Sequence, residues 1–188
     1  KGGNIKRNRE KLDPTGYDVN CISAPTDVEL NHHYLWRFAK KMPKSGHIEI
    51  FDRSWYGRVL VERVEGFASQ NEWQRASDEI NQFEKMWTDE GTIILKFFLC
   101  LDKDEQLKRF EDRENNPDKQ WKITEEDWRN REKWDEYLEA SHDMIESTNT
   151  SYAPWYIVPA DHKKTSRIEV LKTIIRKCEE VLWGVKTY

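Results

Sequence analysis

The stretch at residues 48–67 reads Ile-Glu-Ile-Phe-Asp-Arg-Ser-Trp-Tyr-Gly-Arg-Val-Leu-Val-Glu-Arg-Val-Glu-Gly-Phe, and it decides the fold. Its apolar start predicts a strand over 48–51 that runs directly into Asp52 and Arg53. A carboxylate and a guanidinium therefore arrive together at one end of a strand, which is where α/β sheets hold their ligands. Arg58 and Arg63 follow closely. So many positive charges at one strand end predict that it holds an anion.

The rest of the chain alternates strand patterns with helix patterns. Strand patterns occupy 17–22, 92–101 and 155–158. A helix pattern over 26–41 opens with a capping box of Thr26 and Glu29, and another over 72–86 is stopped by Gly91. A third helix is expected after Asp102, which would form a capping box with Glu105. The last helix carries the apolar residues Ile168, Leu171, Ile175, Cys178 and Leu182. This alternation predicts an α/β fold with a parallel sheet covered by helices on both faces. The 188 residues fit a single domain over 1–188.

The charge of the chain indicates which kinds of partner it can attract. Charged residues make up 35% of the chain and the net charge is −4, so general attraction to nucleic acid or membrane is not expected and an anion must be held by basic residues gathered locally. No run approaches the length of a membrane span, and the first residues do not have the pattern of a signal peptide. The cysteines Cys21, Cys100 and Cys178 lack metal spacing, which predicts reduced thiols in the cytoplasm.

The first residues are Lys1-Gly2-Gly3, followed by a basic stretch that includes Arg7. A lysine and glycines before a helix resemble the end of a phosphate-binding loop, although a flexible leader or a cloning remnant reads the same way. Asp52 and Arg53 are open to a simpler reading too, as an ion pair at a strand end. The nearby hydroxyl of Ser54 and the arginines favour magnesium and phosphate instead.

Residues 115–134 interleave basic and aromatic side chains without a strand of their own. The basic residues expected to act here are Lys119, Lys122, Arg129 and Arg131. A mobile lid that closes positive charge over phosphates has this composition. The alternative is a solvated helix in which Glu125 pairs with Arg129 and Asp127 with Arg131 at a spacing of four.

The motifs resemble those of the polyphosphate kinase 2 family over nearly the whole chain. The 51–67 stretch is similar to the family's Walker B segment, Lys1-Gly2-Gly3 to the end of its Walker A loop, and 119–131 and 150–155 to its lid and a later motif. The segment 31–38 and the Trp-Tyr-Gly-Arg sequence at 55–58 look most like the C-terminal half of the two-domain polyphosphate:AMP phosphotransferases.

The resemblance implies a P-loop kinase-like fold with a helical lid, magnesium as cofactor, and a homo-oligomer. It implies transfer of the terminal phosphoryl group of inorganic polyphosphate to AMP, giving ADP, and leaves open whether ADP also accepts. Asp52, Arg53 and Lys1 would be catalytic, with Asp52 holding magnesium. The residues expected to hold phosphate or polyphosphate are Lys1, Gly2, Gly3, Arg7, Arg58 and Arg63.

One departure from the family is serious. The glycine-rich residues and the central strand that should precede Lys1 are missing, so we expect an interrupted sheet and a chain that is part of a longer protein. Two other functions stay open: an ATP-dependent nucleoside monophosphate kinase, and a domain that binds polyphosphate without catalysis.

Overall fold

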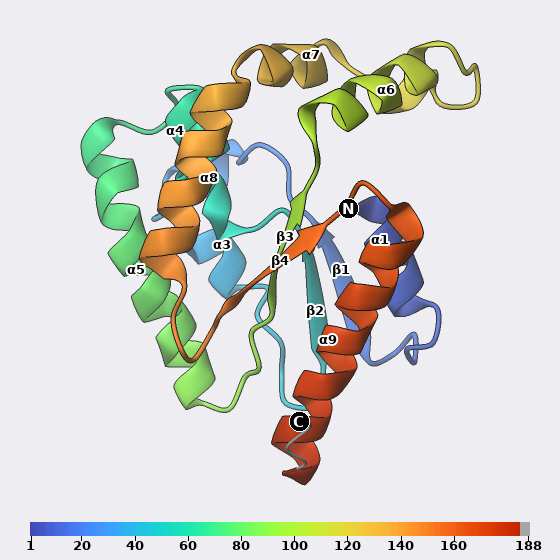
Figure 1. Cartoon of the computed structure of the whole chain (residues 1–188). Coiled ribbons are helices and arrows are strands. Elements are labelled where there is room, and N and C mark those ends of the chain that lie inside the picture. Colours follow the sequence, from blue (N-terminus) through green and yellow to red (C-terminus); the bar gives the residue numbers. More distant parts are fainter. Residues whose placement is uncertain (185–188) are drawn as a thin grey trace. The chain divides into compact units, whose positions relative to one another are not determined.

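The protein is described by a computed structural model over residues 1–184, in which strands alternate with helices (Figure 1). This confirms the α/β class. The strands are β1 (Tyr17–Cys21), β2 (Ile48–Asp52), β3 (Lys96–Cys100) and β4 (Trp155–Pro159). The helices are α1 (Gly2–Arg9), α2 (Asp27–Leu30), α3 (Trp36–Ala39), α4 (Val61–Val64), α5 (Gln70–Asp89), α6 (Lys103–Glu114), α7 (Glu125–Glu132), α8 (Trp134–Thr148) and α9 (Lys163–Trp183), with 3-10 turns η1 (Trp55–Arg58) and η2 (Gln120–Lys122).

The chain groups into two compact units. Unit 1 comprises Lys1–Lys96 and Glu136–Trp155, and unit 2 comprises Phe97–Asp135 and the chain from Tyr156 onward. Unit 1 holds the strand that ends in Asp52, whereas unit 2 holds the segment expected to form a lid. A single domain over 1–188 stays a prediction.

The strands form two separate two-stranded sheets in the part of the chain that the structure describes, as expected for an interrupted sheet. β1 and β2 pair in parallel, with Tyr17 opposite Ile48 and Cys21 opposite Asp52. The second sheet joins β3 to β4. Because β1 and β2 are parallel, their carboxyl ends lie at one edge, and Asp52 is at that edge.

Aromatic packing fixes the core of unit 1. Trp55 packs edge-on against Phe38, Phe51 and Phe83, with ring centroids 5.3–5.8 Å apart. Phe83 comes from α5, whose predicted span 72–86 is confirmed and extended: a capping box of Ser69 and Glu72 opens it, and Gly91 at φ +90° follows its end. Trp55, three residues after Asp52, is thereby packed directly into the core.

The single helix expected over 26–41 is wrong, because the structure has the two short helices α2 and α3 there. The capping box of Thr26 and Glu29 is confirmed. α2 stops at Asn31, whose side chain donates a hydrogen bond to the Asp27 carbonyl at 3.0 Å. Asparagine side chains that bind nearby backbone compete with continued helix, and the two histidines that follow are weak helix formers.

Three further expectations are corrected in part. The strand expected over 92–101 begins only at Lys96, whose side chain is buried in a polar network. Asp102 caps α6 by accepting from the Asp104 amide at 2.8 Å, but Glu105 binds Arg109 instead of completing a capping box. The last helix forms as expected, although Ile168 is among its apolar residues that are more than half exposed.

None of the helices described combines the length and apolar character needed to cross a membrane.

Candidate functional site

The site begins where β2 meets α1. β2 ends at Asp52, and α1 begins at Gly2 with Lys1 as its N-cap. Lys1 Nζ lies 2.9 Å from Asp52 Oδ1. The lysine, the glycines and the carboxylate that the sequence placed in two distant segments therefore come together at the carboxyl end of a parallel strand.

The first turn of α1 adds backbone donors to this strand end. The first four amide N–H groups of a helix have no partner within the helix, and the helix dipole favours negative charge there. Gly2 and Gly3 occupy the first two of these positions. A phosphate group beside Lys1 would therefore meet an ammonium group and backbone amides together.

Arg53 has an unusual backbone conformation. Its φ is +66°, in the left-handed region, where it is the one non-glycine residue among those that the structure describes. Its side chain is exposed, and no ion pair or hydrogen bond to its guanidinium forms within the described chain. A positive charge directly after Asp52 is thus available to an anion, at a residue whose backbone is held in a strained conformation.

The other arginines near the site are engaged by carboxylates. Arg7 pairs with Glu10 at 2.6 Å. Arg58 pairs with Glu62 at 3.2 Å, and its guanidinium lies 4.4 Å from the centroid of the Tyr34 ring. Burial of the Tyr34 hydroxyl raises its pKa, so the tyrosine stays neutral beside the arginine. Their roles as phosphate ligands stay predictions.

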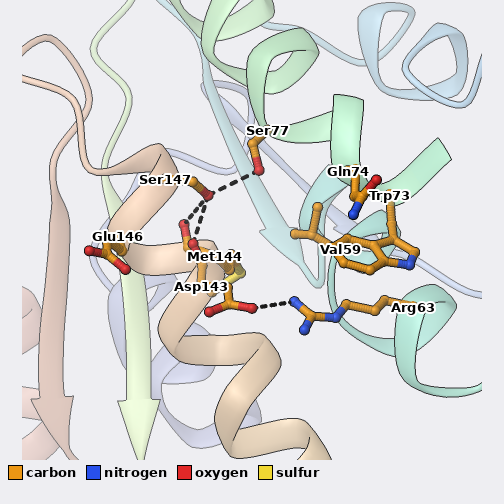
Figure 2. Close-up of a pocket in the computed structure, with 9 residues that line it drawn as sticks. All are labelled: Val59, Arg63, Trp73, Gln74, Ser77, Asp143, Met144, Glu146 and Ser147. Atoms are coloured by element: carbon orange, nitrogen blue, oxygen red, sulfur yellow. Dashed lines mark hydrogen bonds and ion pairs between the residues drawn. The ribbon is translucent and has the colours of Figure 1, made fainter. Parts of the chain in front are cut away.

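Arg63 lies in a separate hollow of about 310 Å³ in unit 1 (Figure 2). Its guanidinium lies 2.7 Å from Asp143 and 3.3 Å from Glu139, both on α8, and 4.2 Å from the centroid of the Trp73 ring. These contacts tie α4 to α5 and α8. Lys1 and Asp52 do not line this hollow. The expected phosphate contact of Arg63 stays a prediction, and its described partners favour a structural role.

The residues expected in the lid lie in unit 2, on η2 and α7. A capping box of Thr124 and Asp127 opens α7. Lys119 pairs with Asp112 at 2.8 Å, and Lys122 Nζ lies 4.8 Å from the centroid of Trp121, whose side chain is 76% exposed. Arg131 donates to the Lys103 carbonyl and to Gln106, and Arg129 lies on the same helix. The lid itself stays a prediction.

The chemistry of the site suits magnesium. Asp52 Oδ1 is buried, and the described residues offer it the Lys1 ammonium but no hydrogen bond of good geometry. Magnesium commonly binds one or two carboxylates and completes its shell with water and substrate phosphates, so a single carboxylate such as Asp52 fits it. A second group, Asp18, His47 and Glu49, gathers at the opposite end of β2, where His47 Nε2 contacts Asp18 at 3.0 Å.

Sequence reasoning missed two residues, Glu84 and Lys96. Glu84 lies on the inward face of α5, one turn after Ile80, and is fully buried. Lys96 is 5% exposed, and its ammonium lies 2.8 Å from the Glu84 carboxylate. The sequence does carry a signal for both residues. Glu84 falls on the apolar stripe of a helix, and Lys96 interrupts the apolar run of the following strand.

Comparison with known proteins identifies the family of the chain. The family model for polyphosphate kinase 2 matches residues 1–182. The fold is that of an α/β protein, and the chain belongs to the polyphosphate kinase 2 family.

Individual relatives and a solved structure are also polyphosphate phosphotransferases or kinases by name. The chain is 58% identical over 177 residues to the polyphosphate:AMP phosphotransferase of Acinetobacter johnsonii, covering 94% of the chain and 37% of the relative. It is 44% identical over 161 residues to the AMP/ADP-polyphosphate phosphotransferase of Meiothermus ruber, covering 86% and 60%. A crystal structure from Pseudomonas aeruginosa PA01, described as a polyphosphate kinase 2, superposes with a TM-score of 0.95 at 49% identity, covering 99% of the chain and 40% of the other. The chain thus spans only part of each.

Proposed function

We propose that this chain carries the catalytic part of an enzyme that transfers the terminal phosphoryl group of inorganic polyphosphate to AMP, giving ADP. One observation carries the proposal: Lys1, the first amides of α1, Asp52 and Arg53 meet at one strand end. The 58% identity to a protein named polyphosphate:AMP phosphotransferase supports this choice of donor and acceptor. The 44% identity to a protein named for both AMP and ADP favours ADP as a second acceptor.

The donor is a polyanion, so its binding needs fixed positive charge and amide donors. In the proposal, the terminal phosphates of polyphosphate lie against the amides of Gly2 and Gly3, and the Lys1 ammonium turns from Asp52 toward them. These groups correspond to the end of a Walker A loop, and the strand end with Asp52 corresponds to Walker B. Correct positioning of the reacting groups supplies much of the rate in phosphoryl transfer.

The transfer step needs no strong base. A phosphate oxygen of AMP, already ionised at neutral pH, attacks the terminal phosphorus of the polymer. A new P–O bond forms while the bond from that phosphorus to its bridging oxygen breaks, and the electron pair stays on the shortened polymer. Arg53, exposed and without a described partner, neutralises charge on the group in transfer.

We assign magnesium to Asp52, whose buried Oδ1 fits a hard cation. When bound, magnesium neutralises charge on the phosphate oxygens. The carboxylate's own part is to hold the cation at the strand end and to keep Lys1 nearby before substrate binds.

The proposal extends to the lid and the assembly. Closure of 115–134 brings Lys119, Lys122, Arg129 and Arg131 over the phosphates and excludes the water that would otherwise accept the phosphoryl group. The cytoplasm, where both substrates occur and thiols stay reduced, is the proposed location, and a homo-oligomer is the proposed assembly.

The test is a phosphoryl-transfer assay on the full-length protein with magnesium. Polyphosphate and ATP are compared as donors, and AMP and ADP as acceptors. ADP formed from AMP with polyphosphate, and not with ATP, supports the proposal. Transfer from ATP alone identifies a nucleoside monophosphate kinase, and polyphosphate binding without transfer identifies a non-catalytic domain; either result overturns it.

A further inference from the structure

The strained backbone of Arg53 needs support from its surroundings. A left-handed conformation is unfavourable for a residue with a side chain, and it persists only where neighbouring structure imposes it. On one side, the Ile22 amide donates to the Asp52 carbonyl at 3.1 Å. On the other, the Gly57 amide donates to the Ser54 carbonyl at 3.0 Å and begins η1.

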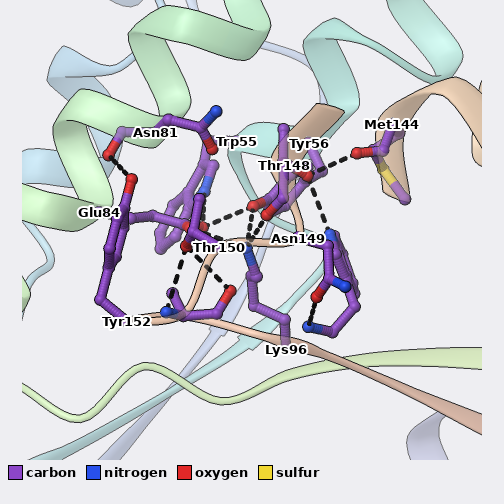
Figure 3. A network of polar contacts seen from close by, with 12 residues as sticks. Trp55, Tyr56, Asn81, Glu84, Lys96, Met144, Thr148, Asn149, Thr150 and Tyr152 are labelled. Carbon is purple, nitrogen blue, oxygen red and sulfur yellow. Dashed lines mark hydrogen bonds and ion pairs between the residues drawn. The ribbon is translucent and has the colours of Figure 1, made fainter. Parts of the chain in front are cut away.

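Glu84 anchors η1 from inside the core (Figure 3). Its Oε1 accepts a hydrogen bond from Trp55 Nε1 at 3.0 Å and another from the Tyr56 hydroxyl at 2.6 Å. Trp55 and Tyr56 are each 5% exposed, so both rings are fixed by packing and by this one carboxylate oxygen. Burial and the adjacent carboxylate raise the pKa of the Tyr56 hydroxyl, which therefore stays a donor at any physiological pH.

Lys96 balances the charge of Glu84. Its ammonium donates to Glu84 Oε2 at 2.8 Å, to the Tyr56 hydroxyl oxygen at 2.9 Å and to the Thr148 carbonyl at 2.7 Å, and it lies 5.2 Å from the centroid of the Trp155 ring. Burial lowers the pKa of Lys96, and the nearby Glu84 opposes that effect. All three donor positions of the ammonium are thus filled.

Stability alone does not account for such a pair. Two charges buried together recover little of their desolvation cost, and apolar replacements of equal volume are often neutral or stabilising. What the pair provides is a fixed geometry: one oxygen of Glu84 accepts hydrogen bonds from both Trp55 and Tyr56, which lie two and three positions after Arg53. The pair thereby joins α5 and the start of β3 to the segment that carries Asp52 and Arg53.

We propose that Glu84 and Lys96 are positioning residues for phosphoryl transfer: by anchoring Trp55 and Tyr56, they hold Arg53 in its left-handed conformation with its guanidinium directed at the reacting phosphate. This inference rests on the proposed function for its catalytic consequence. Its structural content, that the Glu84 carboxylate fixes the backbone of 53–58, is measurable without any activity.

The main test compares Glu84→Leu, which removes both acceptor bonds, with Glu84→Gln, which keeps an acceptor oxygen in a similar volume. Tyr56→Phe removes one hydrogen bond from the other side, and it decides the question if Glu84→Leu fails to fold. Lys85→Met is the matched control, because Lys85 is the next residue on α5 and forms an exposed pair with Asp89 at 2.7 Å.

We expect amide hydrogen exchange over 53–58 to be at least tenfold faster in Glu84→Leu, several-fold faster in Tyr56→Phe, and unchanged in Lys85→Met. In the full-length protein, well below the melting temperature, kcat should fall at least tenfold in Glu84→Leu with KM for AMP and polyphosphate within about threefold. Glu84→Gln should recover most of that loss.

Unchanged exchange over 53–58 in both Glu84→Leu and Tyr56→Phe would overturn the inference. So would faster exchange with undiminished kcat, which would leave the pair a purely structural role. An inactive wild-type protein would instead overturn the proposed function, and exchange would still decide whether Glu84 fixes this segment.

Discussion

Lys1 Nζ lies 2.9 Å from Asp52 Oδ1, and this ion pair joins the first turn of α1 to the carboxyl end of β2. The Lys1 side chain is 52% exposed, and pairs in such surroundings contribute about 0–1 kcal/mol to folding. Its value to the protein is therefore the meeting of a cation and a carboxylate where the substrate phosphates are proposed to bind.

The first prediction concerns Asp52→Asn. Loss of the carboxylate removes the proposed magnesium ligand, so kcat should fall by about 100-fold or more. The melting temperature should change by no more than about 4 °C, since the lost pair is weak. Steady-state kinetics and differential scanning fluorimetry measure both quantities. Asp89→Asn, which removes an exposed carboxylate on α5, serves as control; an active Asp52→Asn variant would reject the assigned role.

The second prediction separates the side chain of Arg53 from its backbone. Glycine adopts φ +66° without the penalty of a side chain, so Arg53→Gly should be more stable than Arg53→Ala by up to about 1 kcal/mol. Both variants should lose at least about tenfold in kcat. Chemical denaturation and kinetics test this. Equal stability of the two variants would mean that the backbone conformation differs.

Arg63 supplies the third prediction. Because its guanidinium contacts Asp143, Glu139 and the Trp73 ring, Arg63→Met should lower the free energy of unfolding by about 1–2 kcal/mol. KM for polyphosphate should stay within about twofold. Arg75→Met, which breaks an exposed pair with Glu79, should cost less than about 0.5 kcal/mol. A tenfold rise in KM would restore Arg63 to phosphate binding.

A fourth prediction addresses the lid. Replacing Lys119 and Lys122 together by methionine removes two cations whose described neighbours, Asp112 and Trp121, lie at the protein surface. KM for polyphosphate should rise about three- to tenfold, and less so at high salt, where charge attraction is screened. The melting temperature should hardly change. Kinetics at two ionic strengths provide the measurement, and an unaltered KM would place the lid contacts elsewhere.

Local patterns predicted much of this fold. The span of α5, the strand ending in Asp52 and the capping box at Thr26 all follow from short-range chemistry that the chain carries in adjacent residues. The meeting of Lys1 with Asp52 was predictable too, but only through the family resemblance, because the two are 51 positions apart in the chain.

Long-range pairing explains what the sequence did not reveal. Glu84 appeared as one acid in a charged helix and Lys96 as an interruption in a strand, and nothing local shows that the two neutralise each other in the core. Likewise, Arg63 reads as one more cation near a phosphate site until α8 brings Asp143 to it. Such partners depend on how elements pack, which periodicity does not specify.

The most direct test of the central claim follows phosphorus itself. Full-length protein, magnesium, AMP and polyphosphate are monitored by ³¹P NMR while the reaction proceeds. The account predicts that the phosphate units lost from the polymer appear in equal amount in ADP, and in ATP where ADP accepts in turn, with little free phosphate. Release of free phosphate without ADP, or no change in the polymer, would contradict it.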